Sequence, residues 1–317
     1  MNISHIHKGF INNRLSLIIA LLVFVALRIP WIGEGEVLEL GASTFIQIGS
    51  ALLLLHFAQK QSIIRQRTLL PAFFYLLLVG TNPLLFYDLR GSVSTFIVLL
   101  CLLFLFDTYQ NPLSQRNALN ISLVLALGSF YWPPLLFFFP VFWYGMYWVK
   151  SFNLKTFFAT LLGLAVVYLF LLAWSVYKND WAVFMQVMPD WSVLWDFRFP
   201  HSASIEESAT NIFLFILFVL SVFNIFMVGV AEKAQARTFL GYLSQLTVVV
   251  SILFLSQNQW GTEWLLILYV PLSIVLAHYF TLSQKPGTMW LLLLTILFFL
   301  LMFAWKWYIL LGNWAVF

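Results

Sequence analysis

The sequence KNDWAVFMQVMPDWSVLWDFRFPHSASIEE, residues 178–207, is the one long segment of this chain that the interior of a lipid bilayer could not hold. Five acidic residues, two basic residues and a histidine alternate there with tryptophan and phenylalanine. The sequence on either side of the segment consists of apolar runs joined by very short connections. We therefore expect this loop to contain most of the structure outside the lipid and to cover whatever the helices enclose.

The composition places the whole chain in a membrane. Hydrophobic residues make up 62% of the sequence and charged residues only 9%, whereas a soluble domain carries about 25% charged residues. Apolar runs close to the ~20 residues that cross a bilayer recur along the entire length, which excludes a soluble domain with a single anchor. The lone cysteine, Cys101, excludes an intrachain disulfide. We expect an all-α, polytopic helical membrane protein that forms one domain over residues 1–317.

Eleven membrane-spanning helices are expected. They lie at about residues 15–31, 40–58, 69–87, 92–106, 118–132, 134–149, 156–177, 210–230, 238–256, 264–281 and 289–310. The first run is too long for the apolar region of a signal peptide and has no small-residue cleavage site, so we expect it to be retained. This count predicts a multi-pass protein of the inner (plasma) membrane, with a cytoplasmic N-terminus, a periplasmic C-terminus and 178–207 as a periplasmic loop.

The distribution of charge supports this topology, because lysine and arginine in short loops set the orientation of a membrane protein. Eleven of the sixteen basic residues fall in the predicted inside loops. Ten of the twelve acidic residues fall on the predicted outside, and the exceptions are Asp107 and Glu232. Since the basic residues are scattered singly at helix ends, the net charge of +4 does not indicate nucleic-acid binding.

The first outer loop carries the first candidate site. Glu34 and Glu36 follow the first span, and a carboxylate held there could act as a general base or bind a sugar hydroxyl. Arg28 lies about a turn below the outer end of that span, where an arginine costs about 2.5–3.5 kcal/mol. Lys306 lies at a similar depth in the last span. Facing inward, Arg28 and Lys306 would form a cationic site for a phosphate. The alternative for the glutamates is an acidic loop that the topology places outside and that has no role in catalysis. The alternative for Arg28 and Lys306 is that their side chains extend to the membrane–water interface.

The second outer turn adds Asp88 and Arg90, a further carboxylate and a further arginine on the same face. An arginine suits phosphate oxygens because its planar fork can donate two hydrogen bonds at once. The alternative is that Asp88 and Arg90 pair with each other. Ser92 is expected to be the N-cap of the helix that follows.

The long loop contains the last candidates, Asp190, Asp196, Arg198 and His201, which alternate with aromatic residues. This pattern fits a substrate platform, since aromatic faces stack on sugar rings, and it also fits an amphipathic helix lying on the membrane. No spacing of histidine, cysteine or acidic residues indicates a metal site, and no glycine-rich nucleotide motif is present. The sequence indicates no particular cofactor.

The run Leu69–Phe106, LLPAFFYLLLVGTNPLLFYDLRGSVSTFIVLLCLLFLF, resembles the third and fourth spans of GT-C-type polyprenyl-phosphate-sugar glycosyltransferases. The run Ala118–Trp148 similarly resembles their short fifth and sixth spans, so that the likeness in layout covers about residues 14–208. It implies a GT-C-like core, Glu34 or Glu36 as the catalytic carboxylate, and Arg28, Arg90 or Arg198 as contacts for the lipid phosphate. The first outer loop is shorter than is common in that family. The chain also resembles uncharacterised multi-span inner-membrane proteins of Bacteroidota.

Three functions are consistent with these features. The first is a glycosyltransferase that acts on a polyprenyl-phosphate-linked sugar at the periplasmic face in envelope glycan assembly. The second, favoured by the short first loop, is a non-catalytic subunit or scaffold of an envelope-assembly or secretion complex. The third is a transporter or lipid flippase, although almost no ionisable residue lies at mid-membrane. The expected partners are membrane lipid, a polyprenyl-phosphate-linked sugar and other envelope membrane proteins, and not nucleic acid.

Overall fold

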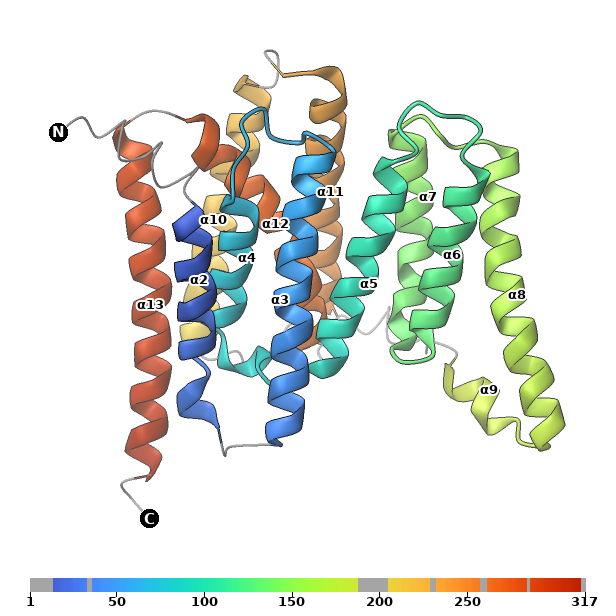
Figure 1. Cartoon of the computed structure of the whole chain (residues 1–317), viewed down its shortest axis with the longest axis horizontal. Coiled ribbons are helices and arrows are strands. Elements are labelled where there is room, and N and C mark those ends of the chain that lie inside the picture. The colour runs from blue at the N-terminus through green and yellow to red at the C-terminus, as the bar shows by residue number, and fades with distance from the viewer. Residues whose placement is uncertain are drawn as a thin grey trace.

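A computed structural model describes residues 14–32, 36–187, 205–228, 232–256, 261–283 and 286–314. These residues form helices joined by turns and short loops, and they contain no β-strand. The helices of eleven or more residues are α2 (Arg14–Ala26), α3 (Val37–Lys60), α4 (Leu70–Gly80), α5 (Leu89–Phe106), α6 (Gln115–Ser129), α7 (Phe138–Trp148), α8 (Leu154–Lys178), α10 (Ile205–Val228), α11 (Ala234–Ser256), α12 (Gly261–Leu282) and α13 (Pro286–Trp314). They run alternately up and down (Figure 1).

Each predicted span overlaps one of these helices, and the all-α fold is therefore confirmed. Seven of the described helices are long and apolar enough to cross a membrane: α3, α5, α8, α10, α11, α12 and α13. Two α-helices, α4 and α7, have only eleven residues each. Prolines account for this shortening, because the tight 3-10 turns η2 (Pro83–Leu85) and η3 (Pro133–Phe137) stand next to them.

The central element is α12, which packs against α4, α5, α10 and α11. In its most apolar window 89% of the residues are buried, against 22% for α8 and for α10. A helix that is apolar on every side is suited to such a position. Trp264, near its start, lies against the rings of Trp132 and Phe138, at centroid distances of 4.8 and 5.7 Å. This contact joins the core to the α6–α7 connection.

The helices α6, α7 and α8 form one side of the molecule, with α8 at its edge (Figure 1). The N-terminus of α8 is fixed by a capping box, in which Asn153 Oδ1 accepts from the Thr156 backbone N–H at 2.9 Å and Thr156 Oγ1 accepts from the Asn153 N–H at 2.8 Å. Gly163 allows α8 to approach α6 closely, because a Cβ there would collide with Ser122 and lie 3.1 Å from the Leu119 carbonyl oxygen. Small residues are a common means of close helix packing in membranes.

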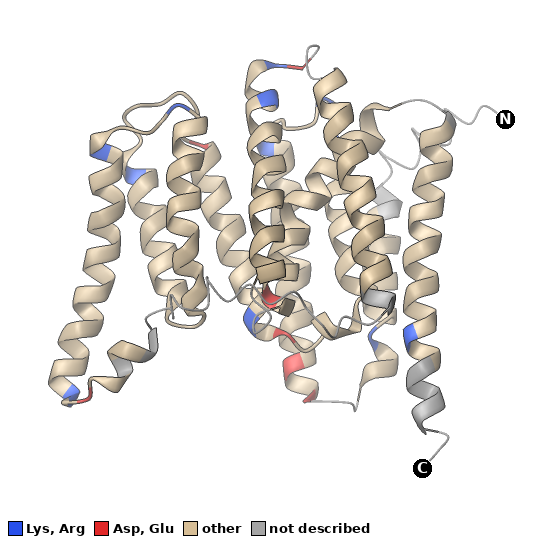
Figure 2. Ribbon diagram, turned by 180° about the vertical axis from the view of Figure 1, so that it is seen from behind, with Lys and Arg blue, Asp and Glu red and all other residues tan. Residues whose placement is uncertain are grey.

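The two ends of the helices differ in their charge. Lysine and arginine gather at the end where α2 begins, and acidic residues predominate at the end where α13 finishes (Figure 2). We call these the basic end and the acidic end. Asp107, one of the two predicted exceptions, lies at the basic end, where Lys60 pairs with it at 2.7 Å and Gln61 donates to it at 2.6 Å. This ion pair ties the end of α3 to the end of α5.

Candidate functional site

At the acidic end, Asp88 caps the N-terminus of α5. Its Oδ1 accepts from the backbone N–H of Gly91 at 2.7 Å. The predicted N-cap, Ser92, is therefore wrong, because the helix already includes it. Ser92 Oγ instead donates to the Asp88 carbonyl oxygen at 2.6 Å. The structure thus uses the Asp88 carboxylate to satisfy a free helical N–H, which also suits the positive end of the helix dipole.

A second carboxylate, Glu263, lies within electrostatic range of Asp88, and Arg90 is close enough to act on both. Glu263 belongs to the first turn of α12 and is buried. Gly91 allows this approach, since a Cβ there would collide with the Asp88 carboxylate and lie 2.8 Å from Leu266. The packing of α5 on α12 therefore brings together two carboxylates that are far apart in the chain, beside an exposed arginine.

The surroundings of Asp88 favour its protonated form. Burial raises the pKa of the Asp88 carboxyl above its usual value, although the Gly91 N–H acts in the opposite direction. Its Oδ2 is buried and accepts no hydrogen bond from the part of the chain that the structure describes, although the Thr262 side chain lies nearby. Thr262 Oγ1 itself donates to Glu263 at 3.3 Å. A carboxyl whose pKa is shifted upward in this way has the property required of a general base.

Arg28 is buried, with 3% of its surface exposed. Its side chain therefore does not extend to the membrane–water interface. Its guanidinium donates to Thr44 Oγ1 and to Gln47 Oε1. It also lies over the rings of Phe24 and Phe86, 4.3 and 4.6 Å from their centroids. No carboxylate in the described part of the chain forms an ion pair with it. Neutral polar groups and aromatic faces thus hold this charge within the helix packing.

A chain of hydrogen bonds connects Arg28 to the turn that holds Asp88. Gln47 Nε2 donates to the Leu85 carbonyl oxygen at 3.0 Å and to Ser92 Oγ at 2.8 Å. Ser92 in turn donates to the Asp88 backbone. Arg28 therefore acts on the candidate site by fixing the position of the η2 turn and the start of α5.

The remaining candidates occupy separate places. Lys306, on α13, donates to Asn82 Oδ1 at 3.2 Å and so reaches the turn between α4 and η2. Glu36 is exposed at the N-cap of α3, and its side chain makes no capping hydrogen bond. Glu34, Asp190, Asp196, Arg198 and His201 lie outside the described residues. Of the predicted site residues that the structure describes, Asp88 and Arg90 are brought together, and Arg28 is joined to them through Gln47 and Ser92.

Sequence reasoning did not single out Glu263, although its position carries a signal. It is an acidic residue in the first turn of an otherwise apolar helix, at the end where Asp88 and Arg90 are expected. Its pairing with Asp88 depends on which helices touch, and the sequence does not show this. Among the described residues, no group of three or more histidine, cysteine or acidic side chains is placed to hold a metal ion.

The fold and its two charged ends define an all-α membrane protein with a carboxylate pair at the acidic end. The chain belongs to a family of unknown function, DUF6427, whose model matches residues 8–310. No curated protein and no solved structure matches the chain.

Proposed function

We propose that the chain is a GT-C-like glycosyltransferase of the inner membrane, which transfers a sugar from a polyprenyl phosphate to an acceptor hydroxyl at the periplasmic face. The distribution of basic residues supports the orientation. Basic loops are retained in the cytoplasm, so the basic end would face inward. The acidic end, with Asp88 and Glu263, would then face the periplasm. In this arrangement each of the eleven α-helices named above, together with its adjoining turns, would form one span, with the N-terminus inside and the C-terminus outside.

The observation that carries the proposal is the packing of the start of α5 on the start of α12, with Leu266 against Gly91, which brings the Asp88 and Glu263 carboxylates within electrostatic range of each other and of the exposed Arg90. Glycosyl transfer needs a base for the acceptor hydroxyl and a cation for the departing phosphate. The pair supplies a carboxylate whose pKa is raised by burial, and Arg90 supplies a planar guanidinium that can bind two phosphate oxygens. Substrate and lipid would meet these groups at the level of the headgroups, where the helices α5 and α12 begin.

In the proposed reaction, the acceptor hydroxyl oxygen forms a bond to the anomeric carbon of the donor sugar. The bond between that carbon and the phosphate oxygen breaks, and the polyprenyl phosphate leaves with the electron pair. The hydroxyl proton passes to the Asp88 carboxylate, while Arg90 stabilises the negative charge of the leaving phosphate. Glu34 and Glu36, in the neighbouring first outer loop, are the alternative bases implied by the GT-C resemblance.

The test uses the purified protein in liposomes, with radiolabelled polyprenyl-phosphate sugars as donors and envelope glycans as acceptors. We expect Asp88→Asn, which keeps a capping side chain, to lower the transfer rate by about 100-fold or more, because general-base catalysis contributes that much. Glu263→Gln should also lower the rate, whereas Glu39→Gln, an exposed acidic residue of α3 at the same end, serves as the matched control.

Two results would contradict this assignment. If Glu34→Gln or Glu36→Gln abolished transfer and Asp88→Asn did not, the base would be in the first loop. If the wild-type protein transferred none of the sugars, the transferase function would be wrong. A stoichiometric envelope protein that co-purified with the chain would then favour the non-catalytic subunit.

A further inference from the structure

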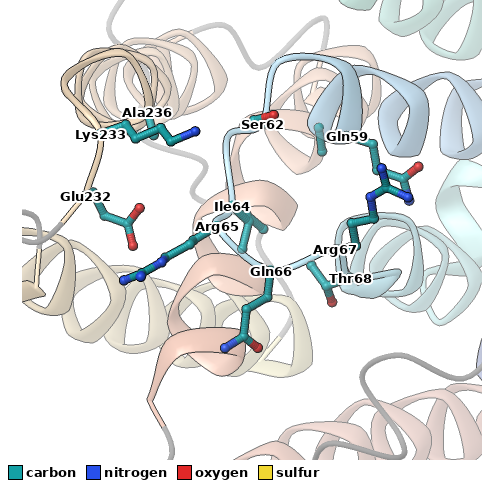
Figure 3. A pocket seen from close by; sticks show the side chains of 11 residues that line it. Gln59, Ser62, Ile64, Arg65, Gln66, Arg67, Thr68, Glu232, Lys233 and Ala236 are labelled. Atoms are coloured by element: carbon teal, nitrogen blue, oxygen red, sulfur yellow. The ribbon is translucent and has the colours of Figure 1, made fainter.

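A pocket of about 380 Å³ opens at the basic end, opposite the Asp88 site. The loop that joins α3 to α4 forms one wall, and the start of α11 with the turn before it forms the other. In Figure 3 the Arg65 side chain extends from the loop toward Glu232, and Lys233 lies across the opening. The Arg67 side chain points to the other side of the loop and lies beside Gln59. The walls come from segments far apart in the sequence.

The charge of this pocket is not balanced. Three cationic side chains line it, against the single carboxylate of Glu232. Within the described residues, neither arginine nor Lys233 forms an ion pair, since the one pair there joins Lys60 to Asp107. The two guanidinium groups point to opposite sides of the loop (Figure 3). A phosphate bound at one of them would accept paired hydrogen bonds there, and the other cations would add a positive field.

The loop that carries the two arginines is anchored at both ends. After α3, Ser62 adopts a left-handed conformation (φ 48°), and the Ile63 N–H donates to the Ala58 carbonyl oxygen at 3.2 Å. Ile63 and Ile64 are buried. Before α4, Thr68 Oγ1 accepts from the Leu70 N–H at 3.2 Å. Arg65 and Arg67 therefore project from a fixed segment, which lowers the entropy cost of binding.

An apolar cavity of about 630 Å³ adjoins the basic pocket. Leu17 and Ile18 of α2 and Leu55 of α3 line it. Arg67, Gln59 and Thr68 line both spaces. A soluble anion would need only the basic pocket, whereas a lipid would need a place for its phosphate and a place for its chain. The two cavities provide both, and they meet at Arg67.

We propose that the two cavities form one binding site for an anionic phospholipid, with the phosphate at Arg67, where the cavities meet, and an acyl chain between α2 and α3. Arg65 and Lys233 add positive charge around the phosphate. Basic pockets between membrane helices at the cytoplasmic side are suited to such headgroups. The site lies at the opposite end from Asp88 and does not depend on the transferase activity.

The experiment is native mass spectrometry of the purified protein from nanodiscs of phosphatidylcholine that contain a minority of phosphatidylglycerol. We expect retained phosphatidylglycerol in the wild-type protein. The double variant Arg65→Gln, Arg67→Gln should lower its affinity by about tenfold or more, because it removes the charge-assisted hydrogen bonds to the phosphate and a neighbouring positive charge. The matched control is Arg116→Gln, Lys155→Gln, which removes two exposed basic residues outside both cavities and should retain the lipid.

Two further measurements distinguish binding of the headgroup from binding of the acyl chain. Leu55→Trp fills the apolar cavity and should weaken lipid binding while leaving the basic residues in place. Inorganic phosphate should fail to displace the lipid. The proposal would be overturned if the control double variant lost the lipid equally, which would indicate a diffuse positive surface. It would also be overturned if inorganic phosphate displaced the lipid or if Leu55→Trp left binding unchanged, because either result would indicate a site for a soluble anion.

Discussion

At the scale of single residues, Arg28 shows how this fold holds a charge at membrane depth. The sequence predicts that an arginine in the first span needs a neighbour, and the structure provides Thr44, Gln47 and two phenylalanine rings. These partners come from α3 and from the segment around η2, so no local pattern could reveal them. The sequence likewise predicts an acidic turn at Asp88 but not its pairing with Glu263, which requires the contact between α5 and α12.

We expect Arg28→Ala to destabilise the protein by about 2–4 kcal/mol, because it leaves a cavity and removes hydrogen bonds to buried groups. Thermal unfolding in detergent would measure the change. Lys306→Ala affects a side chain that is only half-buried and donates to Asn82, and it should cost less. Equal effects of the two substitutions would contradict the packed environment of Arg28.

The pKa of Asp88 predicts a dependence of stability on pH. Because burial raises this pKa above the ordinary 3.8, the native state binds the proton more tightly than the unfolded chain does. The protonated carboxyl therefore adds stability below pH 3.8, and this contribution is lost as the pH rises through the raised pKa. Asp88→Asn should give a melting temperature that depends less on pH over this window than that of the wild type. Under the same conditions Glu39→Gln should keep the wild-type dependence.

At the scale of the elements, apolar run length predicted the helices well. All eleven predicted segments are helical, and the differences arise from proline. The predicted span 69–87 is α4 followed by the η2 turn, because Pro83 does not continue the helix. The tandem prolines Pro133 and Pro134 likewise begin η3 ahead of α7. The contacts between the helices could not be predicted in the same way. Nearly every helix is apolar on all sides, so its sequence pattern does not distinguish a lipid-facing side from a protein-facing side.

The contact between α6 and α8 gives a prediction at this scale. Gly163→Ala should destabilise the protein by about 1–3 kcal/mol, because the added methyl group meets Ser122 and the Leu119 backbone. The matched control is Gly49→Ala in α3, where a Cβ has nothing within 4 Å. That substitution should be neutral or stabilising by up to about 1 kcal/mol, since alanine favours the helix. Thermal unfolding of both variants in the same detergent is the measurement, and a smaller loss for Gly163→Ala than for Gly49→Ala would contradict the close packing.

At the scale of the whole molecule, the sorting of charge was predictable and the central position of α12 was not. Orientation signals are local, because they reside in the lysine and arginine residues of short loops. Both acidic residues predicted at the basic end occur in basic surroundings, Asp107 paired with Lys60 and Glu232 beside Lys233. The burial of α12 depends instead on every other helix. The basic pocket was also not predicted, since its walls come from two loops that only the fold brings together.

Both proposals depend on one claim, that the two charged ends of this helical domain lie on opposite sides of the membrane. The most direct test is labelling of intact cells with a membrane-impermeant maleimide, using single cysteines in a Cys101→Ala background. We predict that Asp180→Cys and Glu36→Cys, exposed at the acidic end, are labelled from outside. Arg116→Cys and Lys150→Cys, exposed at the basic end, should be labelled only after the cells are opened. Labelling of Arg116→Cys in intact cells, with Asp180→Cys protected, would contradict the orientation and both proposed sites with it.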